Sequence, residues 1–321
     1  MNSDSIRAGG TGALEEAHFE RPHLQAIVRQ AQQHPPLTLS VAYPCSEEAL
    51  RCVTQAEALG LVHPILVGPQ RKVADIAERA GLDLSGCTLH DTPDDSPTAA
   101  RVAVELCARG TAAALMKGSL HSDELLAAAV SKTGGLRTGR RASHVFVMDI
   151  PDTPRPLLIT DCVVNIEPGL LEKRDIVQNA LDFAHSLGIA QAKVALLSAI
   201  EIVNPAIPAT VDAAALCKMA DRGQIRGGIL DGPLAYDNAV SQRSAQNKGI
   251  VSAVSGSPDI MLVPNLEAGN MLYKQLVYTA HAECAGLVLG MRVPIVLTSR
   301  SDTIESRVTS CALAVLRAAV L

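Results

Sequence analysis

Short apolar runs rich in branched side chains alternate with amphipathic stretches rich in Ala, Leu and Glu along most of this chain. Residues 37–42, 63–67, 88–90 and 112–116 have the pattern of strands, and apolar residues at helical spacing lie between them. Such alternation is typical of βαβ units, which place parallel strands in one sheet and helices on its faces. The sequence therefore predicts an α/β protein.

The pattern changes after a glycine-rich, basic segment at 133–141 (TGGLRTGRR), which we interpret as a loop. Beyond it, strands at 144–149 and 157–165 flank a Pro/Asp turn and predict a β-hairpin that opens a second α/β region. We expect a later strand to end at Asp231 and a long helix to cover 268–285. Two α/β domains joined without a flexible linker usually hold their site in an interdomain cleft.

Composition excludes several classes of function. Hydrophobic residues make up 48% and charged residues 19%, which disfavours disorder. The net charge is -5, aromatic residues are only 2% and Trp is absent, so nucleic-acid binding through bulk charge or base stacking is not expected. No apolar run approaches the ~20 residues that cross a bilayer, and the N-terminus lacks a targeting pattern, so we expect a cytoplasmic protein without membrane contact. The eight cysteines are scattered singly, which predicts reduced thiols.

Several familiar motifs are missing from the sequence. No G-x-G-x-x-G follows a strand, and there is no P-loop, H-E-x-x-H or G-x-S-x-G. The nine histidines are dispersed, and none has a spacing typical of metal ligands. We therefore expect no metal site, and neither a dinucleotide fold of the usual kind nor a common hydrolase.

Polar and glycine residues follow four of the expected strands. Lys117 and Gly118 come after a buried strand and before a helix, where backbone N–H groups and a Lys form an anion site, although an ordinary turn gives the same pattern. Tyr236 and Asn238 follow a Gly-Pro turn and are candidates to orient a substrate; turn formation and helix capping are the alternative.

The other two segments open helices. Glu267 and Asn270 lie after a strand at a helix start, where Glu267 is also favoured by the helix dipole alone. Ser299, Arg300 and Asp302 follow the last strand, and a planar guanidinium beside a helix N-terminus suits phosphate. The alternative is a Ser/Asp cap with an exposed Arg. From the residues alone, the four segments together indicate an α/β enzyme that uses phosphate.

Several ordered motifs resemble one known family. These are residues 198–205 (SAIEIVNP), 208–213 (PATVDA), 231–239 (DGPLAYDNA), 264–274 (PNLEAGNMLYK) and 297–300 (LTSR). In this order they resemble the phosphate acetyltransferase / phosphate butyryltransferase family, from about residue 37 to the end of the chain. Some similar proteins carry an N-terminal enoyl-CoA-hydratase-like domain, which we expect to be absent because only about 36 residues precede the first strand.

The resemblance implies reversible transfer of a short acyl group between coenzyme A and inorganic phosphate, with acyl-CoA, phosphate and acyl phosphate as partners and no permanently bound cofactor. It implies a homodimer and an isocitrate/isopropylmalate dehydrogenase-like fold. The expected divisions are a tail and leading helix at 1–36, a first domain of 37–142 plus 293–321, and a second domain of 143–292, with a closing helix over 302–319.

The resemblance also implies roles for the last strand's residues. Arg300 would hold the phosphate oxygens, and Ser299 would hydrogen-bond the thiolate or the tetrahedral oxyanion. A carboxylate would act as general base toward the coenzyme A thiol, whose ordinary pKa is ~8.5. The candidates for this base are Asp302 and Glu305.

One departure from the acetyl branch concerns acyl preference. Tyr278 stands where that branch has a second phosphate-binding Arg, whereas the butyryl branch also has a Tyr-Thr pair there, so strict acetyl specificity is not expected. Arg137, Arg140 or Arg141 in the glycine-rich segment would replace that charge or hold the coenzyme A phosphates. Two other functions stay open at this point: a non-catalytic CoA-binding protein, and an NAD-dependent decarboxylating dehydrogenase of related fold.

Overall fold

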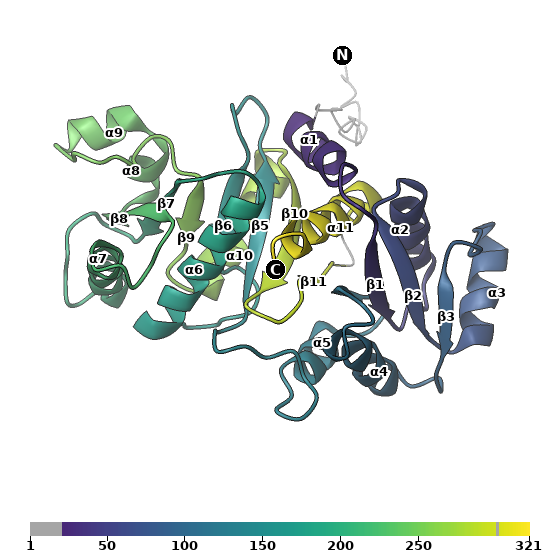
Figure 1. Cartoon of the computed structure of the whole chain (residues 1–321). Coiled ribbons are helices and arrows are strands. Elements are labelled where there is room, and N and C mark those ends of the chain that lie inside the picture. The colour runs from purple at the N-terminus through teal and green to yellow at the C-terminus, as the bar shows by residue number, and fades with distance from the viewer. Residues whose placement is uncertain (1–20, 300–301) are drawn as a thin grey trace, which may run out of the picture.

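One mixed sheet runs through the molecule, with helices packed on both of its faces (Figure 1). The computed structural model describes residues 21–299 and 302–321. Within these residues the sheet has eleven strands in the order β3-β2-β1-β4-β11-β10-β5-β6-β9-β7-β8, and most neighbouring pairs are parallel. The predicted α/β class with mostly parallel strands is confirmed.

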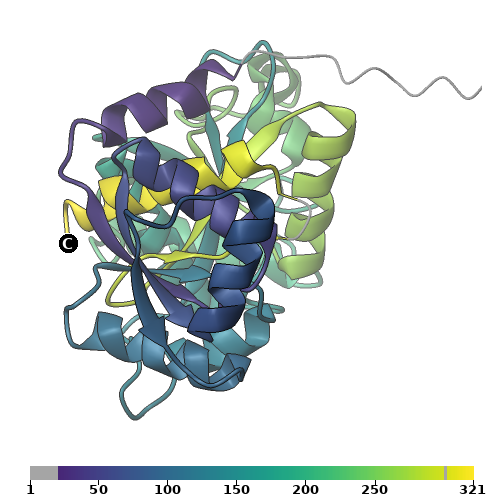
Figure 2. The same cartoon turned by 90° about the vertical axis from the view of Figure 1, so that its right-hand side faces the viewer.

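The first half of the sheet follows the alternation seen in the sequence. Its strands are β1 (Leu37–Ala42), β2 (Val62–Gly68), β3 (Thr88–Asp91) and β4 (Ala114–Lys117). Its helices are α1 (Pro22–Ala31), α2 (Glu47–Ala58), α3 (Gln70–Ala80), α4 (Ser96–Ala108) and α5 (Ser122–Ala129). Ser46 and Asp95 cap α2 and α4 because their side chains accept backbone N–H groups of the first turn. Figure 2 shows α1 and α2 on one side of these strands and α4 and α5 on the other.

The second half begins with the predicted hairpin, in which Val145 lies opposite Thr160. Its strands are β5 (Ser143–Asp149), β6 (Leu157–Thr160), β7 (Ala192–Leu197), β8 (Gly228–Leu234), β9 (Ile260–Leu262) and β10 (Glu283–Leu289). Its helices are α6 (Leu170–Ser186), α7 (Pro208–Asp221), α8 (Tyr236–Val240), α9 (Gln242–Asn247) and α10 (Leu266–Thr279). The chain closes with β11 (Ile295–Val296) and α11 (Ile304–Ala318).

The helix predicted over 268–285 is wrong in its second half. α10 ends at Thr279, His281 adopts a φ of 53°, and the following residues form β10 in the middle of the sheet. A strand buried on both faces has a continuous apolar run, as a buried helix segment does, so periodicity does not separate the two. Pairing with β5 and β11 decides in favour of the strand.

The strand predicted to end at Asp231 continues through Gly232 and Pro233 to Leu234. Pro233 is tolerated because β8 is an edge strand and needs no N–H at that position. A side chain at Gly232 would place its Cβ 2.7 Å from the carbonyl oxygen of Leu196 on β7, so glycine allows the close approach of the two strands. The Gly-Pro pair therefore belongs to the sheet and not to a turn.

The strands of the two halves run in opposite directions. β11 is parallel to β4, but β10 is antiparallel to both β11 and β5, and β5 is antiparallel to β6. β9, β7 and β8 continue parallel to β6. The carboxyl ends of β8 and β9 therefore point away from the end of the sheet at which β4 and β11 finish. The predicted domain boundaries stay a prediction, because one continuous sheet joins the two halves.

α11 is buried along most of its length, from Ser306 to Leu316. It packs against α1, α2 and β10, so the end of the chain fills the interior between the two halves (Figure 1). The helix begins after Thr303, whose side chain accepts the Ser306 N–H, and not at Asp302 as predicted. None of the helices in the described part of the chain is long and apolar enough to cross a bilayer.

Candidate active site

The carboxyl ends of β4 and β11 lie side by side because the strands are parallel neighbours, with Val296 opposite Met116. Lys117 is the last residue of β4, and the segment that carries Ser299 and Asp302 follows β11. Two of the four predicted segments therefore meet at this end of the sheet. Arg300 lies outside the described residues, so its role in binding phosphate stays a prediction.

Asp302 is held in a tight turn with Ser299. The Ser299 N–H donates to Oδ2 of Asp302 at 2.6 Å, and the Asp302 N–H donates to the Ser299 carbonyl at 3.3 Å. Burial raises the pKa of the Asp302 carboxyl, whereas the Ser299 hydrogen bond and the positive charges of Arg307 and Lys117 lower it. Burial is the largest of these effects, so Asp302 is a better proton acceptor than an ordinary surface carboxylate.

Arg307 holds this turn from the first part of α11. Its Nη2 donates to the Ser299 carbonyl at 2.9 Å, and its Nε donates to the Asp302 carbonyl at 3.2 Å. The residue is only 7% exposed, so both hydrogen bonds are shielded from water. Sequence reasoning missed Arg307, because an arginine on an amphipathic helix normally faces solvent. No signal in the sequence distinguishes it.

Lys117 brings a second positive charge to the site from the end of β4. The side chain is 8% exposed, and its ammonium donates to the Leu120 carbonyl at 3.3 Å. A buried lysine that influences the Asp302 carboxyl matches the prediction of positive charge at this strand end. The structure thus brings Lys117, Ser299 and Asp302 together.

Gly118 is required by the backbone around it. Its N–H donates to the Ala42 carbonyl at 2.9 Å, and a Cβ at this position would lie 2.4 Å from that oxygen and 2.5 Å from the Tyr43 carbonyl oxygen. No side chain fits there without moving β1 or β4. Gly118 therefore sets the position of Lys117, and its predicted contact with substrate stays a prediction.

Two neutral side chains lie near Asp302 from α10 and β10. Burial, with the nearby Asp302 and Cys284, raises the pKa of Tyr273 to about 12. Burial also raises the pKa of the Cys284 thiol to about 12. The Tyr273 ring stacks on Phe146 at a centroid distance of 4.5 Å, which fixes its place. Neither residue was predicted; the misassigned helix over 268–285 hid their convergence from different elements.

A second set of predicted residues lies at the other end of the sheet. Asn270 on α10 donates to the Cys162 carbonyl at 3.4 Å, and Glu267 is exposed in the first turn of the same helix. Arg141 precedes β5, where its Nε donates to Asn165 at 2.8 Å and its Nη1 pairs with Glu172 at 3.3 Å. None of the three makes a hydrogen bond or ion pair with Asp302 in the described residues, although Asn270 lies one helical turn before Tyr273 on α10. Their binding roles stay predictions.

Tyr236 and Asn238 lie on α8, beyond the edge strand β8. β8 stands six strand positions from β11, or about 29 Å at the usual strand spacing. Asn238 is fully buried and bonds Ser244 at 3.1 Å and Lys248 at 3.2 Å, which joins α8 to α9. Tyr278 ends α10 and is 69% exposed. Tyr236 and Asn238 are not brought to Asp302, whereas Tyr278 lies close enough to Tyr273 to raise the pKa of that residue. The contacts of all three residues with substrate stay predictions.

The arrangement suits one kind of chemistry. A partly buried carboxylate can accept a proton, two cationic side chains offset negative charge, and an exposed hydroxyl at Ser299 lies in the same turn. In the described residues, no group of three or more His, Cys, Asp or Glu side chains is placed to hold a metal ion. The fold and the site together are those expected of an α/β enzyme that acts on a small anionic substrate.

Comparison with known proteins identifies the family. A family profile described as "Phosphate acetyl/butaryl transferase" matches residues 96–315. A phosphate acetyltransferase of Rhizobium meliloti is 51% identical over 293 residues, covering 91% of this chain and 92% of the relative. A phosphate butyryltransferase of Clostridium acetobutylicum is 42% identical over 278 residues, covering 87% and 92%. The chain belongs to the phosphate acetyl/butyryl transferase family, as the sequence motifs predicted.

Solved structures agree with this assignment. A branched-chain phosphotransacylase from Enterococcus faecalis V583 matches with a TM-score of 0.76 at 31% identity, covering 88% of this chain and 99% of that one. A 4-hydroxythreonine-4-phosphate dehydrogenase from Klebsiella pneumoniae matches with a TM-score of 0.55 at 14% identity, which shows a shared fold alone. The predicted family, fold class and enzyme class, an acyltransferase acting between coenzyme A and phosphate, are confirmed.

Proposed function

We propose that this chain reversibly transfers a short acyl group, acetyl or butyryl, between coenzyme A and inorganic phosphate while both substrates are bound, with Asp302 as the proton acceptor. The observation that carries this proposal is the partly buried Asp302 carboxyl, held by the Ser299 N–H next to Lys117 and Arg307. Binding both substrates together supplies much of the rate without a covalent acyl-enzyme.

In the direction that makes acyl-CoA, the thiol proton passes to Asp302. The thiolate then attacks the carbonyl carbon of the acyl phosphate, the C–S bond forms, and the C–O bond to phosphate breaks. In the reverse direction phosphate attacks the thioester, and the departing thiolate takes the proton back from Asp302. A raised carboxyl pKa brings the acceptor closer to the ~8.5 of a free thiol, which favours this transfer.

Positive charge and a hydroxyl serve the two oxyanions of the reaction. Lys117, together with Arg300, would hold the phosphate oxygens and offset the charge that develops on the leaving group. The Ser299 hydroxyl would hydrogen-bond the thiolate or the tetrahedral oxyanion. Lys117 ends β4 and Ser299 follows β11, and these two parallel strands finish at the same end of the sheet, which supports a common site.

Asp302 is preferred to Glu305 as the base. Glu305 is exposed in the first turn of α11, where the helix dipole alone explains an acidic residue. Asp302 is the carboxylate that is partly buried beside cationic side chains. This difference in environment supports Asp302, which the resemblance already favoured over Glu305.

The other predicted substrate-binding residues would contact parts of coenzyme A that are remote from the thioester. Coenzyme A is an extended molecule, so groups remote from the thioester can meet residues that lie away from Asp302. We propose that these contacts come from Arg141, Tyr236, Glu267, Asn270 and Tyr278. Gly118 would line the site beside Lys117, and the fully buried Asn238 would hold α8 in place. We also propose a homodimer that works in the cytoplasm without a permanently bound cofactor, with the site in a cleft between the two halves.

Phosphate-dependent release of thiol from acetyl-CoA and butyryl-CoA tests the activity. Thiol release with either substrate should require phosphate and should be lost in Asp302→Asn. The matched control, Glu305→Gln, should keep most of the activity. Release that ignores phosphate would contradict acyl transfer, and full activity in Asp302→Asn with loss in Glu305→Gln would move the base to Glu305.

A further inference from the structure

A cavity of about 530 Å³ opens on the solvent side of α6, away from the proposed acyl-transfer site. Arg174, Asp175, Gln178, Asp182 and His185 line it at helical spacing, so one face of α6 forms its floor. The inner side of this helix packs with Val145 and Val147 of β5. Their neighbours Phe146 and Met148 face α10, so the sheet separates this cavity from Tyr273.

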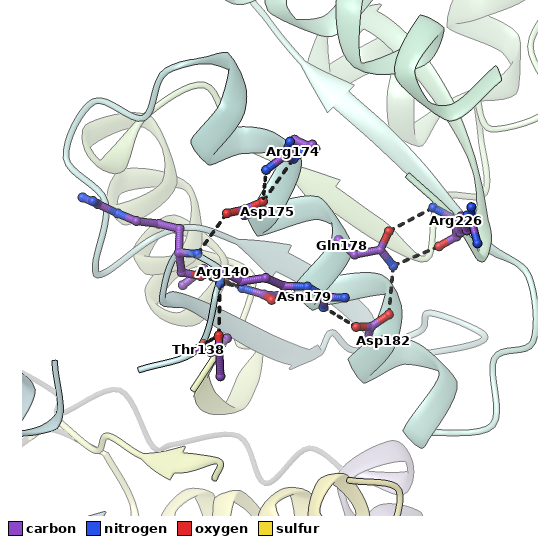
Figure 3. A network of polar contacts seen from close by, with 11 residues as sticks. Thr138, Arg140, Arg174, Asp175, Gln178, Asn179, Asp182 and Arg226 are labelled. Atoms are coloured by element: carbon purple, nitrogen blue, oxygen red, sulfur yellow. Dashed lines mark hydrogen bonds and ion pairs between the residues drawn. The ribbon is translucent and has the colours of Figure 1, made fainter. Parts of the chain in front are cut away.

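Three arginines reach the cavity from three separate segments (Figure 3). Arg140 comes from the glycine-rich loop before β5, Arg174 from α6, and Arg226 from the turn before β8. Arg140 pairs with Asp182, and Arg174 pairs with Asp175 at 2.8 Å. Three guanidinium groups face two carboxylates, so positive charge is in excess.

Each oxygen of these two carboxylates already accepts a hydrogen bond. Asp182 accepts Gln178 on Oδ1 at 2.8 Å and Arg140 on Oδ2. Asp175 accepts Arg174 on Oδ1 and the Arg141 N–H on Oδ2 at 3.0 Å. Among the described residues, neither acid forms an ion pair with the third guanidinium, that of Arg226. The cavity therefore holds one more guanidinium than its two carboxylates pair with.

Arg226 supplies that surplus. Its backbone N–H donates to Gln178 at 2.9 Å and its carbonyl accepts from Gln178 at 3.0 Å, which fixes the residue against α6 (Figure 3). Its Nε donates to the Gly223 carbonyl at 2.9 Å, whereas both Nη atoms make no hydrogen bond or ion pair with the residues that the structure describes. The Arg226 backbone is therefore held in place, and its two Nη groups are available to donate to a ligand.

Gly227 and His185 close the wall beside Arg226. The ring Nε2 lies 2.8 Å from the Gly227 carbonyl oxygen. A Cβ on Gly227 would come within 2.3 Å of the ring, and its φ of 91° also favours glycine. The wall therefore depends on the absence of a side chain at this position.

We propose that this cavity binds a small metabolite carrying two separated anionic groups, phosphate or carboxylate, as a site additional to the acyl-transfer site. Arg174 and Asp182, the partner of Arg140, are eight residues apart on α6, about 12 Å along the axis, so one anionic group does not satisfy both ends. The volume suits a ligand of metabolite size. Arg140 belongs to the segment that leads into β5. A ligand bound to Arg140, Arg174 and Arg226 would therefore connect this segment to α6 and to the turn before β8.

Isothermal titration calorimetry of the intact protein tests the site, with fructose 1,6-bisphosphate and citrate as the phosphate and carboxylate probes. At least one probe should bind, and Arg226→Gln should weaken its binding about tenfold or more, because it removes a charged bidentate donor while keeping both backbone bonds to Gln178. Arg222→Gln, an exposed arginine of the same turn outside the cavity, is the matched control and should bind as the wild type does.

Binding should persist when coenzyme A and phosphate saturate the acyl-transfer site and when Arg300 is replaced by Ala. Arg174→Gln provides a second variant, which should weaken the same probe if Arg226→Gln does not fold. The proposal is overturned if neither probe binds at millimolar concentration, if Arg222→Gln weakens binding as much as the cavity variants, or if coenzyme A and phosphate abolish it. Preference between the two probes identifies the anionic group that the site takes.

Discussion

The Ser299 N–H and the Oδ2 atom of Asp302 are joined across 2.6 Å, so one oxygen of this carboxylate is committed to the backbone. The other oxygen, Oδ1, accepts no hydrogen bond from the described residues. A carboxylate fixed through one oxygen presents the second in a defined direction. This geometry supports the proposal that Asp302 is a positioned proton acceptor and not merely a charge near the end of β11.

Asp302→Asn should reduce acyl transfer by about 10²–10⁴-fold and remove its pH dependence in the acidic range. Burial raises the pKa of Asp302, so the basic form, and with it the wild-type rate of thiol attack on acyl phosphate, increases with pH until it levels off above that pKa. The asparagine has no such transition. Rates measured across the pH range with acetyl phosphate and coenzyme A check both effects.

The same substitution should not destabilise the fold at neutral pH. An acid whose folded pKa is raised contributes stability at low pH and loses that contribution as the pH rises through the folded value. The ionised, partly buried Asp302 therefore costs stability at pH 7, and the neutral asparagine avoids this cost. Urea unfolding should show an unfolding free energy equal to or above that of the wild type; a clear loss would mean that Asp302 is structural.

Arg307→Ala should remove the two hydrogen bonds that hold the Ser299–Asp302 turn and cost about 2–3 kcal/mol of stability. Loss of its positive charge also raises the pKa of Asp302 further, since that charge now lowers it. The acidic limb of the pH–rate profile should move to higher pH, and kcat should fall more than KM rises.

Arg307→Lys separates the two effects of this residue. Lysine keeps the positive charge but not the fork that reaches two carbonyl oxygens. Its pH–rate profile should stay near that of the wild type while the melting temperature falls. A shift of the profile in Arg307→Lys as large as in Arg307→Ala would show that the geometry of the turn, and not the charge, sets the pKa of Asp302.

Local sequence patterns predicted the strands around Lys117 and Ser299 because hydrophobic periodicity and capping residues are local signals. Strand order and direction are not local. The apolar run of β10 suits a helix and a strand equally, so the sequence did not show that the strand direction reverses there. Without that reversal, the distance between Tyr236 and Asp302 was not predictable. Arg307 was missed for a related reason, since only tertiary packing tells a buried arginine from an exposed one.

Gly118→Ala should destabilise the protein by about 1–3 kcal/mol, because the new Cβ would overlap the Ala42 and Tyr43 carbonyl oxygens. Relief of this clash moves the end of β4 and with it Lys117, so activity should fall together with stability. Gly139→Ala is the matched control: nothing lies near its Cβ, and its effect on stability should stay within about 0.5 kcal/mol. Thermal unfolding of both variants checks the contrast, and equal melting temperatures would contradict it.

His144 should make the fold sensitive to acid. The ring is 1% exposed, its Nδ1 has no partner in the described residues, and burial lowers its pKa to about 3. The unfolded chain takes up a proton at the ordinary histidine pKa of ~6.5, whereas the folded chain resists it. The contribution of His144 is therefore complete above about pH 6.5 and is lost as the pH falls toward 3, by an amount on the order of 5 kcal/mol.

His144→Gln removes this titration and should flatten the dependence of the unfolding free energy on pH between about 6.5 and 4. The exposed His63 on β2 offers the control, since His63→Gln should keep the wild-type slope. Urea unfolding at several pH values measures the slopes. The neighbouring Asp161, whose buried carboxyl has a raised pKa, contributes with the opposite sign, so its charge does not produce the acid loss assigned to His144. An unchanged slope in His144→Gln would show that other groups take up the protons.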